Sequence, residues 1–127
     1  MANLAGYKFA KEHEWLVTAG EDYRLGISDY AQKELGDVVY VDLPQVGKQI
    51  KRGESFMTVE SVKAVSDIFA PVDGVVVAVN TALSAQPELV NKDPYEGGWV
   101  VIIKAADIGQ VSEMMEASAY EDYIAGL

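Results

Sequence analysis

The sequence contains no cysteine, and this absence excludes several kinds of chemistry at once. Without thiols the chain can form neither disulfides nor thiolate-bound metal or iron–sulfur centres, and it has no cysteine nucleophile. The single histidine, His13, cannot build a multi-histidine metal site. Any sulfur redox chemistry would therefore have to come from an attached cofactor, and the sequence does not indicate metal catalysis.

Long apolar runs and an excess of positive charge are also missing. The apolar residues occur in short groups, far below the roughly 18 consecutive residues that a membrane helix requires. The formal net charge of −10 repels the phosphate backbone of nucleic acids. The N-terminal residues resemble neither a signal peptide nor an organelle presequence. These features predict a cytoplasmic protein of bacterial type that binds neither membranes nor nucleic acid.

The acidic balance leaves two interpretations open. Complementary charge mainly raises the rate of encounter between proteins, so an acidic surface suits fast, reversible docking onto basic patches. The same charge is also a common way of keeping a protein in solution.

Short β-branched and aromatic runs separated by Gly, Pro and Asp predict a mainly β fold. The length of 127 residues fits one domain over residues 1–127. All four prolines fall between the expected strands, where a missing backbone N–H breaks no sheet ladder. We expect strands over Tyr7–Phe9, Glu14–Thr18, Tyr23–Ile27, Val38–Leu43, Ser55–Glu60, Val65–Phe69, Gly74–Val79 and Trp99–Lys104.

Two helical regions interrupt this pattern. Ser28 can cap a short helix near residues 28–35, and Gly36 can end it. Near the C-terminus, apolar residues recur at helical spacing from Ile108 to Ile124. This spacing predicts C-terminal helices whose apolar faces pack on a sheet.

Residues 36–42 and 74–80 match in type over seven positions, and each segment is followed by a loop and another strand. The match predicts two similar β units packed as a flattened barrel or sandwich. A repeat of this length, rich in Val and Gly, also arises by chance in β proteins. Lys63 lies between the strand that closes the first unit and the segment that leads into the second.

Lys63 is expected at or beside the tip of a hairpin around residues 55–70. An exposed tip is where a modifying enzyme or a partner can reach a side chain. The flanking residues are Val62 and Ala64, where a turn would favour Gly, Asn or Asp, and an apolar exposed turn often marks recognition. From these residues alone, both a functional lysine and a merely solvating lysine remain open.

Glu60-Ser-Val-Lys-Ala64 resembles the lipoylation motif of glycine cleavage H proteins. The resemblance covers nearly the whole chain in order and spacing. It is carried by Lys11–Trp15, Leu25–Ser28, Ala31–Gln32, Leu35–Asp37, Val41–Pro44, Ser66–Asp67, Ala70–Val72, Val79–Asn80, Pro87–Asn91, Pro94–Tyr95 and Gly97–Trp99. It implies a hybrid barrel-sandwich fold of the biotinyl/lipoyl type, with lipoate amide-linked to Lys63. Glu60, Ser61, Val62 and Ala64 would then be the residues that the modifying enzyme recognises.

The neighbours of Lys63 distinguish between carrier families. Biotin carriers characteristically place Met on both sides of the lysine, whereas Val62 and Ala64 stand here. Lipoyl domains of the keto-acid dehydrogenases usually lie in longer chains with flexible Pro/Ala linkers, which this sequence lacks. Both features favour a free-standing shuttle.

The resemblance implies a non-catalytic carrier, expected to be a monomer, that serves glycine catabolism and one-carbon metabolism. A pyridoxal-phosphate glycine decarboxylase would load an aminomethyl group onto the lipoyl arm. A tetrahydrofolate-dependent aminomethyltransferase would unload it, and a dihydrolipoamide dehydrogenase would reoxidise the arm. A lipoate ligase or lipoyltransferase would attach the arm in the first place.

Two more residues carry roles over from the resemblance. Glu14 stands where relatives shield the loaded arm in a surface cleft, and its carboxylate could accept hydrogen bonds from the amine. Asp67, four residues past Lys63, would lie near the arm. The alternatives are a solvated glutamate and a turn-stabilising aspartate. Tyr30 and Glu34 stand where some relatives carry histidine, so histidine-assisted chemistry in the cleft is not expected.

A second function within the same family remains open, namely an H-like protein that donates lipoyl groups to other lipoyl domains. Its arm would look the same in sequence. An enzyme would need a phosphate-binding glycine loop, a nucleophile–base pair or a metal cluster, and the sequence offers none. A structural β domain with an unmodified Lys63 would require that no ligase recognises the motif.

Overall fold

The computed structural model describes residues 4–127, which form ten strands and five helices within that range. The strands are β1 (Lys8–Phe9), β2 (Glu14–Ala19), β3 (Asp22–Ile27), β4 (Val38–Asp42), β5 (Gln49–Ile50), β6 (Ser55–Ser61), β7 (Val65–Phe69), β8 (Gly74–Val79), β9 (Val101–Ala105) and β10 (Met115–Glu116). The helices are α1 (Asp29–Leu35), α2 (Ala82–Ala85), α3 (Leu89–Lys92), α4 (Ile108–Ser112) and α5 (Ala117–Ala125).

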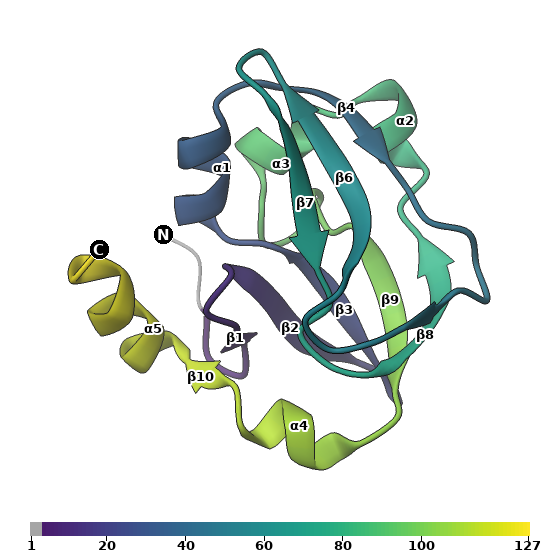
Figure 1. The fold of residues 1–127 in the computed structure, drawn as a ribbon, viewed down its shortest axis with the longest axis vertical. Coiled ribbons are helices and arrows are strands. Elements are labelled where there is room, and N and C mark those ends of the chain that lie inside the picture. The colour runs from purple at the N-terminus through teal and green to yellow at the C-terminus, as the bar shows by residue number, and fades with distance from the viewer. Residues whose placement is uncertain (1–3) are drawn as a thin grey trace.

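These strands form two antiparallel sheets (Figure 1). One has the order β10–β1–β2–β3–β9–β8–β5, and the other has the order β4–β6–β7. The mainly β prediction and all eight predicted strands are confirmed, with ends shifted by no more than two residues. Strands β5 and β10 were not predicted. Each has only two residues and is defined by its pairing, with β8 and β1 respectively, so no local pattern marks it.

The predicted repeat is present in the strand pairing. Strand β4 pairs with β6 and strand β8 pairs with β9, in both cases antiparallel. The register slips between positions 38 and 40 in the first pair and between positions 76 and 78 in the second, which are equivalent places in the two segments. The bulged residues, Val39 and Val77, are both exposed. The two units thus share a pairing and a β-bulge, a feature that reorients a strand locally.

The main core lies between the two sheets and draws on both. Leu16 and Leu25 of the larger sheet and Val59 of the smaller one are fully buried there. A smaller cluster of Phe9, Trp15 and Tyr120 joins β1 and β2 to α5. The rings of Phe9 and Tyr120 stack with centroids 4.4 Å apart. This contact attaches α5 to the sheet, so the packed apolar face predicted there is confirmed. The helical spacing was wrong at Met115, which pairs with β1 as part of strand β10, and Ile108 is 67% exposed and does not pack on the sheet.

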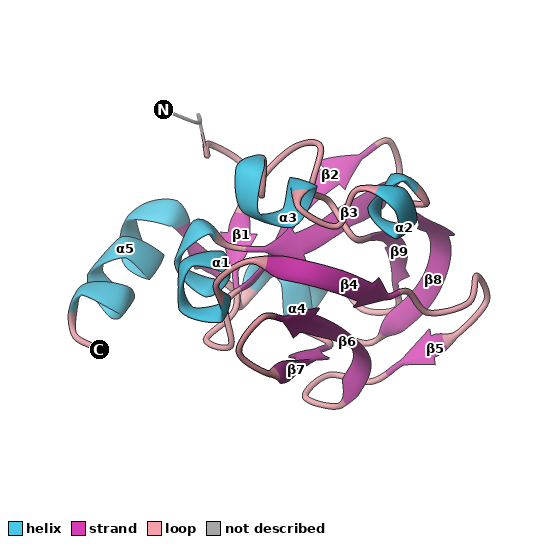
Figure 2. Cartoon of the chain, turned by 90° about the horizontal axis from the view of Figure 1, so that it is seen from above, coloured by secondary structure: helices cyan, strands magenta, loops and turns pink. Residues whose placement is uncertain are grey.

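Helix α1 begins and ends as its sequence predicts. The Ser28 hydroxyl oxygen accepts a hydrogen bond from the Ala31 N–H at 3.1 Å, which satisfies one of the free donors of the first turn. Gly36 closes the helix through its N–H to the Gln32 carbonyl and adopts a positive φ of 78°, a conformation that glycine reaches without strain. Helices α1 and α5 lie at the same end of the molecule (Figure 2).

The Trp15 ring packs against Gly26, its partner on the neighbouring strand. The indole is fully buried, and its N–H donates to the carbonyls of Ile27 and Pro94 at 3.0 and 3.1 Å. A Cβ at position 26 would lie 2.5 Å from the indole ring. A side chain at position 26 would therefore push the indole away from the two carbonyls to which it donates.

We expect Gly26→Ala to lower the free energy of unfolding by about 1–3 kcal/mol, because it overpacks a filled core. Urea unfolding at fixed pH measures this change. Gly126→Ala is the control, since a Cβ there meets nothing closer than 3.7 Å and should change stability by less than about 0.5 kcal/mol. A Gly26→Ala protein as stable as the wild type would contradict this packing.

Candidate functional site

Lys63 stands in the turn that joins β6 to β7, and the turn is built around Ser61. The last cross-strand pair is Glu60 with Val65, and the Ser61 N–H donates to the Ala64 carbonyl at 2.8 Å. The Ser61 hydroxyl oxygen accepts hydrogen bonds from the backbone N–H groups of Lys63 and Ala64, both at 3.2 Å. A serine side chain thus performs the turn-stabilising role for which Gly, Asn or Asp would be expected.

The turn is also bonded to the loop that joins α1 to β4. The backbone N–H of Val62 donates to the Asp37 carbonyl at 3.0 Å. The Lys63 side chain is exposed, and within residues 4–127 its ammonium group has no hydrogen-bond or ion-pair partner. The backbone below the lysine is therefore held from two sides while its amine stays available. This geometry leaves the amine accessible to a reacting partner.

The outer face of the small sheet surrounds this lysine with apolar and acidic side chains. Val62 and Val65 are 68% and 62% exposed, and Val39 and Tyr40 of β4 are exposed beside them. The cross-strand rows of this face are Tyr40–Glu60–Val65 and Asp42–Thr58–Asp67. Strands β4, β6 and β7 contain neither lysine nor arginine. The surface near Lys63 therefore suits a partner whose own surface is apolar with basic groups around it.

Glu14 opens strand β2 and is only 2% exposed. This burial rules out the solvated glutamate considered from the sequence. Burial raises the pKa of Glu14 to about 8, against hydrogen bonds from its own N–H and from the Phe69 N–H, which lower the pKa. The carboxyl group thus lies between β2 and the end of β7, and it is largely protonated at neutral pH.

Asp67 lies on strand β7, two residues before Phe69. Its side chain is exposed and accepts a hydrogen bond from the Ser55 hydroxyl at 2.9 Å, across the base of the hairpin. Asp67 and Lys63 therefore belong to the same exposed hairpin, whereas the Glu14 carboxyl group lies inside the protein. The structure does not place all three side chains in one open cleft.

A chain of hydrogen bonds next to Glu14 links three side chains, His13, Tyr120 and Ser28, whose contact no sequence pattern predicts. His13 Nδ1 lies 2.8 Å from the Tyr120 hydroxyl, which lies 2.7 Å from the Ser28 hydroxyl. Burial raises the pKa of Tyr120 to about 12 and lowers the pKa of His13. A protonated tyrosine between a neutral imidazole and the serine that caps α1 fits these directions.

His13 also has a backbone φ of 78°, and it is the one residue other than glycine with a positive φ in the described part of the chain. That conformation is unusual for a residue with a side chain. It turns the chain from β1 into β2 and aims the imidazole at Tyr120. Neither a strained φ nor a tertiary hydrogen bond leaves a local sequence signal, so the network could not be found from the sequence.

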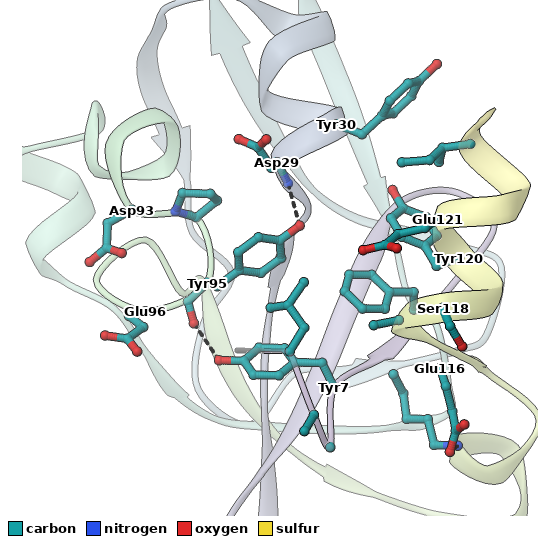
Figure 3. A pocket seen from close by; sticks show the side chains of 18 of the residues that line it. Tyr7, Asp29, Tyr30, Asp93, Tyr95, Glu96, Glu116, Ser118, Tyr120 and Glu121 are labelled. Atoms are coloured by element: carbon teal, nitrogen blue, oxygen red, sulfur yellow. Dashed lines mark hydrogen bonds and ion pairs between the residues drawn. The ribbon is translucent and has the colours of Figure 1, made fainter. Parts of the chain in front are cut away.

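A cavity of about 1150 Å³ opens between the N-terminal segment, α1, the loop at residues 93–96 and α5 (Figure 3). Aromatic rings line much of it, and their polar atoms are paired. The Tyr7 hydroxyl donates to the Tyr95 carbonyl at 2.9 Å, and the Tyr95 hydroxyl accepts from the Asp29 N–H at 3.0 Å. Lys63, Glu14 and Asp67 do not line this cavity. It is therefore separate from the lysine hairpin.

Other kinds of site find no support in the described residues. Across residues 4–127, no group of three or more acidic, histidine or cysteine side chains is arranged to hold a metal ion. The helices of the same range include none with the length and apolarity needed to cross a bilayer. Two packed β sheets with an exposed, unpaired lysine at a hairpin tip fit the architecture of a lysine-linked cofactor carrier.

Comparison with known proteins identifies the family within that class. The family model described as glycine cleavage H-protein matches residues 7–126. The glycine cleavage system H protein of Bacillus licheniformis is 48% identical over 117 residues, which is 92% of each chain. An Escherichia coli protein of the same name is 52% identical over 123 residues, which is 95% of each chain. The chain belongs to the glycine cleavage H-protein family.

The fold agrees with a solved member of that family. The crystal structure of a glycine cleavage system H protein from Mycobacterium marinum superposes with a TM-score of 0.85. It is 38% identical in sequence, and the match covers 96% of this chain and 98% of that one. The barrel-sandwich architecture expected from the sequence is thereby confirmed.

We expect the buried carboxyl group of Glu14 to make the protein less stable as pH rises. Between the ordinary value of 4.5 and the folded pKa of about 8, the native state holds a proton that the unfolded chain has released. Unfolding then releases a proton, so the contribution of Glu14 to stability falls by up to about 1.4 kcal/mol per pH unit across this window. Glu14→Gln keeps a hydrogen-bond acceptor but cannot ionise.

The measurement is urea unfolding of the wild type and Glu14→Gln at several pH values from 5 to 8. The free energy of unfolding of Glu14→Gln minus that of the wild type should increase as the pH rises. Glu21→Gln, at an exposed position in the turn between β2 and β3, is the control and should follow the wild type. A difference between Glu14→Gln and the wild type that stays constant over this range would show that Glu14 is not protonated in the folded state.

Proposed function

We propose that this chain is a lipoyl carrier of the glycine cleavage system and that Lys63 carries the lipoyl group. The observation that supports the site most strongly is the exposed, unpaired ammonium of Lys63 at the tip of the β6–β7 hairpin, in a chain of the H-protein family. We also propose that the chain is one carrier domain, with its lipoyl hairpin around residues 55–70. Its role is that of a carrier and not of a catalyst.

The residues of the hairpin have two tasks in this proposal. Ser61 and the Val62–Asp37 hydrogen bond keep the turn in one conformation, so a modifying enzyme meets a preformed shape. Together with Glu60 and Ala64, these residues form the surface that a lipoate ligase or lipoyltransferase recognises. The attached lipoyl group would supply a disulfide that accepts the aminomethyl group and is later regenerated.

A tethered arm needs partners that bind briefly and one after another. Attachment presents the reactive end of the arm to each docked active site at a high effective concentration. The apolar and acidic face beside Lys63 favours docking to surfaces with basic groups, which raises encounter rates without requiring tight binding. The proposed partners are the glycine decarboxylase, the aminomethyltransferase, the dihydrolipoamide dehydrogenase and the lipoyl-attaching enzyme. We propose that the chain meets them as a monomer in the cytoplasm.

Glu14 and Asp67 remain proposed contacts of the loaded arm, with different requirements. Asp67 is exposed on the strand that follows Lys63, so an arm folded back along β7 can reach it directly. The Glu14 carboxyl group is buried and bonded to the Phe69 N–H, so the arm reaches it only if side chains near the end of β7 move apart. An amine arriving there would meet a neutral acid that can give it a proton and then bind it as an ion pair.

The test is lipoylation of the pure protein by a lipoate–protein ligase with ATP and lipoate, read by intact mass. The wild type should gain one lipoyl group, and Lys63→Arg should fold normally and gain none because it lacks the amine to be acylated. Lys51→Arg is the matched control, since Lys51 is also exposed in a turn, and it should be labelled like the wild type.

Two results would overturn the proposal. One is a lipoylated Lys63→Arg protein, which would move the site to another lysine. The other is an unlabelled wild type in a reaction where a known H protein is labelled, which would mean that the motif is present but not recognised.

A further inference from the structure

Gly36, which follows α1 and precedes β4, lies against the side chain of Lys63. A Cβ built on Gly36 would come within 3.0 Å of Lys63 Cε and 4.0 Å of Lys63 Nζ. Every other glycine with a positive φ in residues 4–127 has open space at this position. The absent side chain of Gly36 therefore leaves room that the lysine stem fills, in addition to the conformational role of Gly36 at the end of α1.

Asn91 of helix α3 fixes the segment Gly36–Val38 with three hydrogen bonds. Its amide donates to the Gly36 carbonyl and to the Gln32 side chain, both at 2.9 Å. Its carbonyl oxygen accepts from the Val38 N–H at 2.8 Å. One side chain thus holds the residues on both sides of Asp37.

Asp37 in turn receives the hydrogen bond from Val62 at the lysine turn. The contacts form a continuous path from α3, through Asn91 and the α1–β4 loop, to the backbone next to Lys63. The path contains one side-chain link, at Asn91, and one backbone link, at Asp37. Displacement of either would change the position of the turn relative to the end of α1.

We propose that Gly36–Val38 is a seat for the aliphatic stem of Lys63 and that Asn91 is the positioning residue that holds the seat. The inference rests on the proposed lipoylation of Lys63. An unrestrained lysine side chain has many rotamers, and limiting them lowers the entropy lost when the amine enters an enzyme. The seat directs the stem over the end of α1, so the amine is presented in one direction.

A pair of glycine variants separates the seat from backbone strain. Gly36→Ala and Gly53→Ala both place a Cβ at a positive φ, of 78° and 86°, so both should lose stability, and their lipoylation is compared at a temperature where both are folded. Only Gly36→Ala crowds the lysine, because nothing lies within 4 Å of a Cβ at Gly53. At subsaturating protein, Gly36→Ala should be lipoylated about fivefold more slowly than Gly53→Ala, a difference of about 1 kcal/mol.

A pair of asparagine variants tests the positioning role in the same assay. Asn80 also makes three hydrogen bonds, two to the carbonyls of Gly97 and Trp99 and one from the Ala82 N–H, away from the lysine turn. Asn91→Ala and Asn80→Ala therefore each remove three hydrogen bonds. Asn91→Ala should slow lipoylation severalfold, and Asn80→Ala should leave the rate within about twofold of the wild type at a temperature where both are folded.

A second readout needs no enzyme. Reductive methylation with ¹³C-formaldehyde labels the lysines and preserves their charge, and Lys63→Arg identifies the Lys63 signal by its loss. In the wild type the methylated Lys63 side chain should be less mobile than that of Lys51. Gly36→Ala should raise the mobility of Lys63 to that of Lys51, and Gly53→Ala should leave it unchanged.

Equal lipoylation rates and equal lysine mobility in Gly36→Ala and Gly53→Ala would overturn the seat, as would faster lipoylation of Gly36→Ala. Normal lipoylation of Asn91→Ala would overturn the role of Asn91. A wild type that takes no lipoyl group refutes the proposed function instead, and the mobility measurement then still decides whether the seat exists.

Discussion

The hydrogen bond from the Val62 N–H to the Asp37 carbonyl is the contact on which the arrangement of the lysine hairpin depends. A two-stranded hairpin alone is only marginally stable in water. Here β6 also pairs with β4, and the turn beyond the last strand pair is bonded to the loop that leads into β4. The lysine backbone is therefore fixed to the body of the protein although its amine is exposed. A carrier needs this combination, because a partner must find the attachment point in a constant place.

The region below the hairpin buries an ionisable side chain, whereas the hairpin exposes one. Glu14 is an ionisable group held away from water, and an unpaired carboxylate there would be costly. The protein avoids this cost by keeping Glu14 protonated, with two backbone N–H groups as its hydrogen-bond donors. Next to it, His13 adopts an unusual backbone conformation and joins Tyr120 and Ser28 in a chain of hydrogen bonds. Perturbed groups of this kind gather at functional sites more often than elsewhere, which supports Glu14 as a contact of the arm.

The sequence allowed much of the fold to be predicted because the strands and α1 carry local signals. The short β-branched and aromatic runs, the capping residue Ser28 and the closing residue Gly36 each predict what they form. Strands β5 and β10 exist only through tertiary pairing and have no such signal. The equivalent bulges in β4 and β8 show that the faint repeat in the sequence reflects a repeated structure.

For the candidate site, the motif predicted the hairpin and the place of Lys63, but not what holds them. The absence of Gly, Asn or Asp next to the lysine looked unusual, and the Ser61 hydroxyl explains it. The burial of Glu14 could not be read from a pattern in which Glu12 and His13 are both polar, since it depends on the packing of β2 against β7. The contacts of Asn91 could not be predicted from the sequence because its partners lie more than 50 residues away along the chain.

The central claim is that the lipoylated chain carries a one-carbon unit derived from glycine, and loading of the arm tests it most directly. The lipoylated protein is mixed with glycine and a matching pyridoxal-phosphate glycine decarboxylase, and its intact mass is followed. Our account predicts a mass gain of one aminomethyl group and one hydrogen, which needs both glycine and the decarboxylase. Adding the aminomethyltransferase and tetrahydrofolate should reduce this gain to the two hydrogens of the dithiol form. A lipoylated protein that stays unloaded, while a known H protein is loaded in the same mixture, would contradict the shuttle function and leave donation of lipoyl groups to other lipoyl domains as its role.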